Sequence, residues 1–255
     1  PHTVFLLCAP TTHPDDVAVT VRSRCRVVSL RTPPAADVAR VLVARDGVAP
    51  DLADWAAHAA QGHIGRAKRL ATDEVARNRR ETVLSVPLRL TSMQGCLEAA
   101  DELIEAAESE ARAISESLDE PEREALTQSL GAGGTGKGAG TAARGMAGAL
   151  RELERKQKTR ATRVQRDSLD RALVDLTGFY RDVLLVQVGS DVELSHADHA
   201  SQVREVADRV SQDWVLRGLD QIVATRTALE TNVKPKFAVD AMVATVGQAL
   251  KTDRD

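Results

Sequence analysis

The chain has 255 residues, of which 43% are hydrophobic and 28% charged, a globular composition with enough length for one or two domains. Its formal net charge of −3 excludes a protein that coats nucleic acid through bulk positive charge. Aromatic residues make up only 2%, so the core must be built mainly from Ala, Val and Leu, which favours closely packed helices.

Residues 3–9, "TVFLLCA", form a continuous apolar run that ends at Pro10. Such a run predicts a strand buried on both faces of a parallel sheet. A short helix-compatible piece follows, and then a β-branched strand over residues 26–30, which ends before the turn signal Pro33-Pro34. An α/β layer is therefore predicted for residues 1–32. Because an apolar run begins almost directly after Pro1, we expect that the natural chain starts further upstream.

Three short helices are predicted over residues 33–75. The first carries helically spaced apolar residues from Asp37 and ends at Gly47, and the second opens at Pro50 and stops near Gly62. The segment "HIGRAKRLA" starts the third. Together they predict a small helical bundle.

The middle of the chain is strongly patterned in charge. Residues 98–124 hold eleven acidic residues and two arginines, which predicts a solvated helix that frays. Residues 131–148 are rich in glycine, as flexible linkers are. Residues 151–171 have eight basic and four acidic side chains, so a solvated helix face is expected, with contact to DNA or to acidic neighbours as the alternative.

The glycine-rich stretch also resembles a phosphate-binding loop. Gly131 and the pair Gly136-Lys137 fit the first seven positions of GxxxxGK[ST], but the eighth residue is Gly138, which has no hydroxyl for a magnesium ion. The motif also needs a buried strand before it, and the preceding segment is a polar helix. The sequence therefore favours a linker.

The C-terminal half is predicted to be an all-helical bundle. Apolar residues recur every three or four positions over 169–187, 203–214, 219–229 and 239–250. The overall fold class is therefore mainly α, with the end of an α/β domain in front.

No metal site or disulfide framework is predicted. Cys8, Cys25 and Cys96 are an odd number without CxxC spacing, which suits a reducing, cytoplasmic compartment, and Cys8 and Cys25 are expected to be small core residues or spacers. No apolar run approaches the roughly 18–20 residues of a membrane span, so no membrane contact is expected. The histidines form no ligand cluster, and most are predicted to lie on the surface: His2, His13, His58, His63, His196 and His199.

Residues 3–34, "TVFLLCAPTTHPDDVAVTVRSRCRVVSLRTPP", resemble the last part of the nucleotide-binding domain of bacterial DNA polymerase III clamp-loader subunits, members of the AAA+ family. The order of strand, threonine, proline-containing loop, short helix, Ser-Arg-Cys and strand carries the resemblance. It implies an AAA+ α/β end in residues 1–32, a lid in 33–75 and a helical collar in 76–255, with an insertion at about 98–150.

The resemblance also implies functional residues. Arg24, between Ser23 and Cys25, matches an arginine finger that reaches in trans toward the γ-phosphate of ATP on a neighbouring subunit. Thr11 or Thr12 matches the sensor-1 position, although a turn or capping role fits these residues equally well.

A second arginine is implied in a lid helix. Arg66, in "GHIGRAKRL", resembles the sensor-2 arginine that contacts nucleotide in this family, and a solvated surface arginine is the alternative.

The Walker motifs of such a subunit would precede Pro1, so no cofactor is expected on this chain alone, and ATP with Mg²⁺ is expected in the assembled complex. The implied partners are the tau/gamma and delta subunits through collar and AAA+ interfaces, with the sliding clamp and primed DNA reached through the complex. The segment "VRSRCR" is more similar to the delta-prime branch, which has no expected activity of its own. An ATP-hydrolysing tau/gamma-type subunit and a helical interaction scaffold unrelated to replication remain alternatives.

Overall fold

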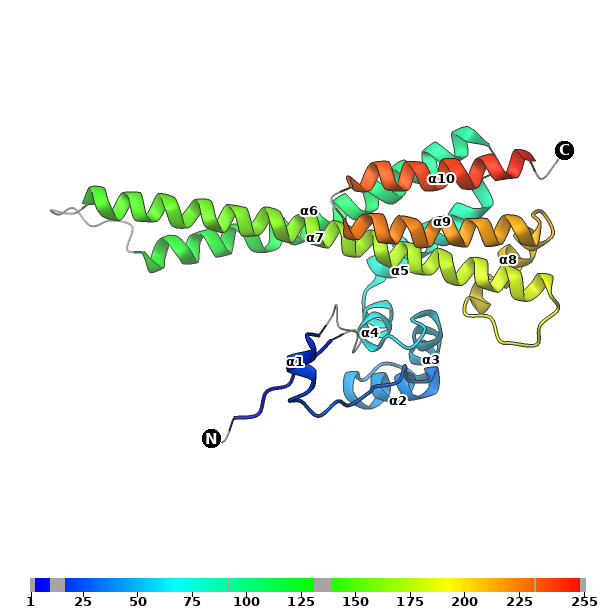
Figure 1. The fold of residues 1–255 in the computed structure, drawn as a ribbon, viewed down its shortest axis with the longest axis horizontal. Helices are drawn as coiled ribbons and strands as arrows, with labels where there is room; N and C mark the ends of the chain where they lie inside the picture. Colours follow the sequence, from blue (N-terminus) through cyan, green and yellow to red (C-terminus); the bar gives the residue numbers. More distant parts are fainter. Residues whose placement is uncertain (1–2, 10–16, 91, 131–138, 232, 253–255) are drawn as a thin grey trace.

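The computed structural model describes residues 3–9, 17–90, 92–130, 139–231 and 233–252, and this part of the chain is mainly helical (Figure 1). Its helices, in chain order, are α1 (Val19–Arg22), α2 (Ala35–Asp46), α3 (Pro50–Ala59), α4 (Ile64–Thr72), α5 (Glu74–Arg89), α6 (Met93–Ser129), α7 (Ala139–Gln187), the 3-10 helix η1 (Ala197–His199), α8 (Ala200–Ala207), α9 (Gln212–Glu230) and α10 (Pro235–Thr252).

The strands predicted at residues 3–9 and 26–30 are absent from the described part of the chain, and this prediction is wrong there. A strand is held by hydrogen bonds to a neighbouring strand, and within the described residues neither segment pairs with another. Phe5 is 83% exposed and Leu30 is 91% exposed, where burial was expected. Cys8 and Cys25 are exposed as well, so neither is a core residue here.

Helices α2, α3 and α4 pack on one another as a small bundle with its own apolar core. Gly47 ends α2 in the left-handed conformation at φ +67°, where its N–H reaches the carbonyls of Leu42 and Val43. Pro50 occupies the first turn of α3, where its missing N–H costs nothing. The three helices predicted from these signals are confirmed.

The next two helix starts are capped by side chains. Asp73 Oδ1 accepts from the N–H groups of Val75 and Ala76 at the start of α5, at 2.9 and 3.2 Å. Ser92 Oγ accepts from the Gly95 N–H at the start of α6, at 3.1 Å. These caps fix where the chain turns between the small bundle and the helices that follow.

Helices α6 and α7 form a long hairpin that projects to the left of the other helices (Figure 1). The acidic run does not fray, because α6 continues to Ser129 and Arg160 on α7 bonds to both Asp119 and Glu122. Of the predicted linker 131–148, residues 131–138 lie outside the described residues. The remaining residues belong to α7, which begins at Ala139. The linker prediction is therefore wrong for residues 139–148.

The large bundle consists of α5, the bundle-proximal parts of α6 and α7, and α8 to α10. Tyr180 lies at its centre and packs edge-on against Phe179 and Trp214, with ring centroids 6.0 and 5.6 Å apart. The Trp214 indole N–H donates to the Val246 carbonyl at 3.1 Å. Three of the six aromatic residues of the chain thus meet in the core of the large bundle.

The single helix predicted over 203–214 is two helices in the structure. The chain leaves α8 after Ala207, and Ser211 caps α9 by accepting from the Trp214 N–H at 3.2 Å. Val210 is buried in the turn between them, so the apolar spacing continues through a break in the helix. Spacing alone therefore missed the boundary.

Candidate functional site

Arg24 lies in an exposed turn directly after α1. Its Nη1 donates to the Thr20 carbonyl at 2.7 Å, and Ser23 Oγ donates to the same carbonyl at 3.1 Å. Within the described residues no carboxylate pairs with Arg24, and Cys25 beside it is an exposed free thiol. The Ser-Arg-Cys turn therefore presents a guanidinium to solvent. Thr11 and Thr12, matched to the sensor-1 position, lie outside the described residues.

Arg66 is neither solvated nor free for a ligand. Its side chain is only 10% exposed, and Nη2 forms an ion pair with Asp175 on α7. Arg66 therefore joins the small bundle to the large bundle. Arg24 instead bonds to the Thr20 carbonyl, and the two arginines share no partner within the described residues.

Asp198, on η1, makes the second polar link between the two bundles, through a hydrogen bond from Trp55 on α3. It accepts from the Trp55 indole N–H at 2.9 Å and from Arg80 Nη1 at 2.8 Å, and Arg80 lies 5.5 Å from the centre of the Trp55 ring. Burial would raise the pKa of Asp198, but bonds from His199, Arg80 and Trp55 hold it far below the usual range.

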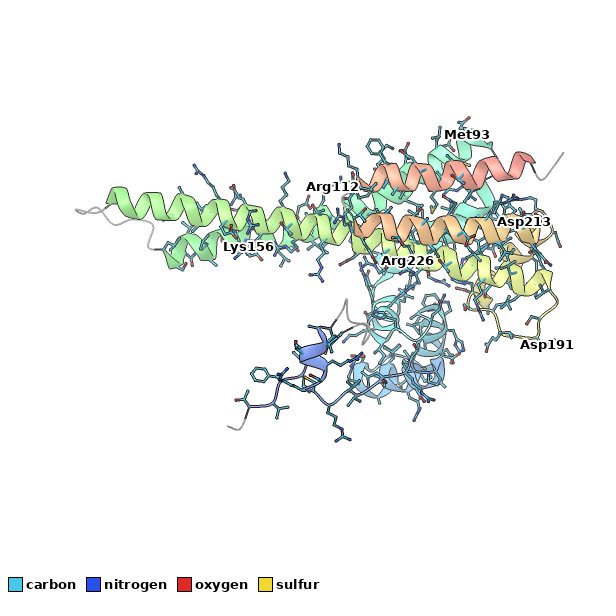
Figure 2. All side chains as sticks on the ribbon, viewed as in Figure 1. Met93, Arg112, Lys156, Asp191, Asp213 and Arg226 are labelled. Carbon is cyan, nitrogen blue, oxygen red and sulfur yellow. The ribbon has the colours of Figure 1, made fainter. Side chains whose placement is uncertain are left out.

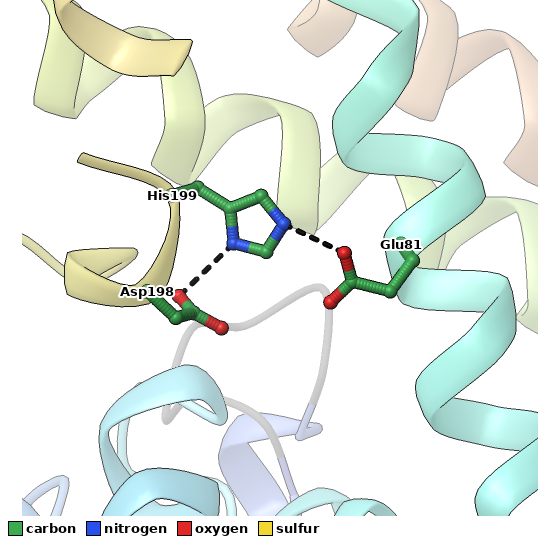
Figure 3. A group of neighbouring side chains, drawn as sticks. All are labelled: Glu81, Asp198 and His199. Atoms are coloured by element: carbon green, nitrogen blue, oxygen red, sulfur yellow. Dashed lines mark hydrogen bonds and ion pairs between the residues drawn. The ribbon is translucent and has the colours of Figure 1, made fainter. Parts of the chain in front are cut away.

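His199 is held between two carboxylates (Figure 3). Its Nε2 lies 2.9 Å from Glu81 on α5, and its Nδ1 lies 3.1 Å from Asp198. The bond to Asp198 raises its pKa, with a smaller contribution from Glu81, against the opposing effect of burial. The ring is 6% exposed, so the prediction of a surface histidine is wrong at this position.

Glu81, Asp198 and His199 also place one ligand atom each within 4.8 Å of one another, the spacing of a metal site. A histidine binds a metal through an unprotonated nitrogen, whereas both nitrogens of His199 face carboxylates and its pKa is raised. Asp198 is further engaged by Arg80 and Trp55. The cluster is therefore better explained as a set of ion pairs.

His196 is completely buried, which also corrects the surface prediction. Asp182 Oδ2 lies 3.0 Å from His196 Nδ1 and accepts from its backbone N–H at 2.8 Å. Burial lowers the pKa of His196, but Asp175, 3.9 Å from its Nε2, and the hydrogen-bonded Asp182 outweigh that effect and raise it. This pair fixes the loop after α7 against the large bundle.

Glu110 on α6 is a buried carboxylate, 4% exposed, that is surrounded by arginines. It pairs with Arg69 from α4, with Arg79 from α5 at 3.0 Å and with Arg171 from α7 at 2.9 Å. Ser168 Oγ donates to it at 2.7 Å. Burial would raise the pKa of Glu110, but the Ser168 bond and the arginine charges lower it.

A cavity of about 70 Å³ lies beside this cluster, between the small bundle and the large bundle. Its charged and hydroxyl-bearing lining residues are Arg66, Arg69, Arg79, Arg80, Glu110, Ser168, Arg171 and Asp175. The sequence analysis found only Arg66 among them. The others lie on four different helices. The local sequence signal that pointed toward contact between these helices was the opposite charge of the acidic and basic runs.

Searches of family models, of curated proteins and of solved structures found no match to this chain. Among the helices of the described ranges, none combines the length and apolar character that crossing a bilayer requires.

Proposed function

We propose that this chain is a clamp-loader subunit of the delta-prime type, which contributes Arg24 in trans to an ATP site on a neighbouring subunit. The observation that carries the proposal is the exposed Ser-Arg-Cys turn, where Arg24 has a backbone partner but no carboxylate partner in the described residues. Arginine is permanently charged, and its planar fork can bind two oxygens of one phosphate. A guanidinium in such a position suits stabilisation of phosphoryl transfer on another chain.

The helices support the rest of the proposal. In this account α2 to α4 are the lid, and the helices from α5 onward are the collar that holds the subunit ring together. Arg66 is committed to Asp175, which fits a subunit that forms a rigid wall of the ring better than one that senses its own nucleotide. The exposed apolar segments 3–9 and 26–30 would need strand partners to complete an AAA+ domain.

Arg66 also bears on the two alternatives. An ATP-hydrolysing tau/gamma-type subunit would need Arg66 at its nucleotide, so release of the Asp175 pair when ATP is added to the full-length subunit, with its Walker motifs, would favour that alternative. A helical scaffold unrelated to replication would keep the same internal pair but would join no clamp-loader subunit.

Assembly tests the proposal directly. The full chain is mixed with purified delta and tau/gamma subunits from the same organism and analysed by size-exclusion chromatography with light scattering. We expect one complex that contains all three proteins. Elution of the chain alone, under conditions where delta and tau/gamma associate with each other, would contradict the proposal and favour the unrelated scaffold.

A further inference from the structure

The cavity beside Glu110 is surrounded by an excess of cationic groups. Five arginines and two carboxylates line it, and the arginines come from α4, α5 and α7, so they face it from several directions. Two of these arginines have a further carboxylate outside the lining, Asp73 for Arg69 and Asp198 for Arg80. Arg80 also has Glu81 at 3.9 Å, so with these outer carboxylates counted the five guanidinium groups face five carboxylates, and the excess of positive charge is confined to the lining itself.

In the cavity lining, hydrogen-bond donors exceed acceptors by more than positive charges exceed negative ones. Five guanidinium groups carry about 25 N–H donors, whereas two carboxylates offer about eight lone-pair positions. Glu110 alone is shared by Arg69, Arg79 and Arg171. The two lining carboxylates therefore cannot accept from every donor of the five arginines.

One of the unsatisfied donors is deeply buried. Arg80 is 3% exposed and its Nε has no hydrogen-bond partner in the described part of the chain; the nearest carboxylate oxygen, on Asp175, is 3.9 Å away. An unpaired buried donor costs free energy unless something else accepts from it. This donor belongs to a residue that lines the cavity.

From these observations we infer that the cavity binds a phosphate-type oxyanion, held by Arg79, Arg80 and Arg171. A tetrahedral ion accepts hydrogen bonds from several directions at once, which matches guanidinium groups that arrive from different helices. A cavity of about 70 Å³ has room for on the order of five water positions, enough for one such ion but not for a nucleoside. The ion is either free phosphate or the terminal phosphate of a nucleotide.

The site is independent of the proposed function, because Arg24 takes no part in it. By bonding to arginines of α5 and α7, a bound oxyanion would tie together two helices of the large bundle beside its junction with the small bundle. Phosphate is therefore expected to stabilise the folded chain through mass action.

Calorimetric titration of the full chain with inorganic phosphate, at ionic strength matched with chloride, tests the inference. We expect a dissociation constant below about 1 mM for the wild type and at least tenfold weaker binding for Arg79→Gln and Arg171→Gln, the loss expected from one charged hydrogen bond. Arg112→Gln is the matched control, because Arg112 lies on the same helix as Glu110 with a side chain 60% exposed (Figure 2). Absence of phosphate binding, or equal binding by all four proteins, would overturn the inference.

A second variant is expected to change phosphate affinity in the opposite direction. Glu110→Gln removes the carboxylate that competes for Arg69, Arg79 and Arg171, so a folded variant should bind phosphate about tenfold more tightly. Unchanged or weaker binding by the folded variant would contradict the inference. Competition by ADP assigns the site to a nucleotide's terminal phosphate, and binding of phosphate without competition by ADP assigns it to the free ion.

Discussion

At the scale of single residues, two buried histidines beside carboxylates strengthen the large bundle close to its junction with the small bundle. His199 is held by Asp198 and Glu81, with Arg80 on the far side of Asp198, and the pKa of His199 lies above its ordinary 6.5. His196 beside Asp182 is shifted in the same direction. In both residues, contact with carboxylates therefore favours the protonated form in the folded structure.

This predicts a pH dependence of stability. Because the folded pKa of His199 is raised, its contribution is fully present below about pH 6.5 and is lost as the pH rises through the folded value. We expect the thermal midpoint to fall between pH 6.5 and 8.5, and to fall less steeply in His199→Gln. The measurement is calorimetric unfolding over that range. The partly exposed His58→Gln is the control, and an identical slope in wild type and His199→Gln would contradict the assignment.

At the scale of elements, ion pairs between the acidic run of α6 and the basic run of α7 hold the two arms of the hairpin together. Arg160 contacts Asp119 at 2.6 Å, and Gln157 on the same helix donates to the Asp119 carbonyl at 3.0 Å. Arg123 reaches Glu154 at 3.3 Å on the opposite arm. The acidic neighbour expected for the basic run is therefore the chain's own acidic run.

Removing one of these links should loosen the hairpin locally. In Arg160→Ala we expect amide hydrogen exchange over residues 115–125 and 155–165 to become about fivefold faster, the size typical of a partly exposed ion pair. Arg163→Ala is the matched control, since Arg163 is 82% exposed and its ion pair within the described residues is to Asp167 of the same helix, at 3.8 Å. Equal exchange rates in the two variants would show that the Arg160 link does not hold the arms together.

At the scale of the whole molecule, local signals predicted the helices but not their partners. Gly47 and Pro50 mark helix ends because their backbone chemistry acts within a few residues, and the apolar spacing of α7 reports a buried face. The prediction of strands at 3–9 and 26–30 was wrong because a strand needs a neighbouring strand to bond with, and local sequence does not specify one.

The same reasoning applies to the sites. The burial of His199 depends on Glu81, 118 positions away in the sequence, and the Glu110 cluster joins residues of four helices. A local sequence pattern does not show which residues far apart in the sequence come into contact. The exposed Ser-Arg-Cys turn could be located from sequence because all three of its residues are adjacent.

The most direct test of the proposed function is clamp- and DNA-stimulated ATP hydrolysis by the reconstituted complex, comparing wild type with Arg24→Ala and with Arg31→Ala, a nearby exposed arginine outside the turn. If Arg24 completes a neighbour's ATP site, Arg24→Ala should lower turnover at least tenfold while the ring still assembles, because arginine fingers contribute strongly to phosphoryl transfer. Arg31→Ala should match the wild type. Unchanged turnover by Arg24→Ala in an intact ring would contradict the account.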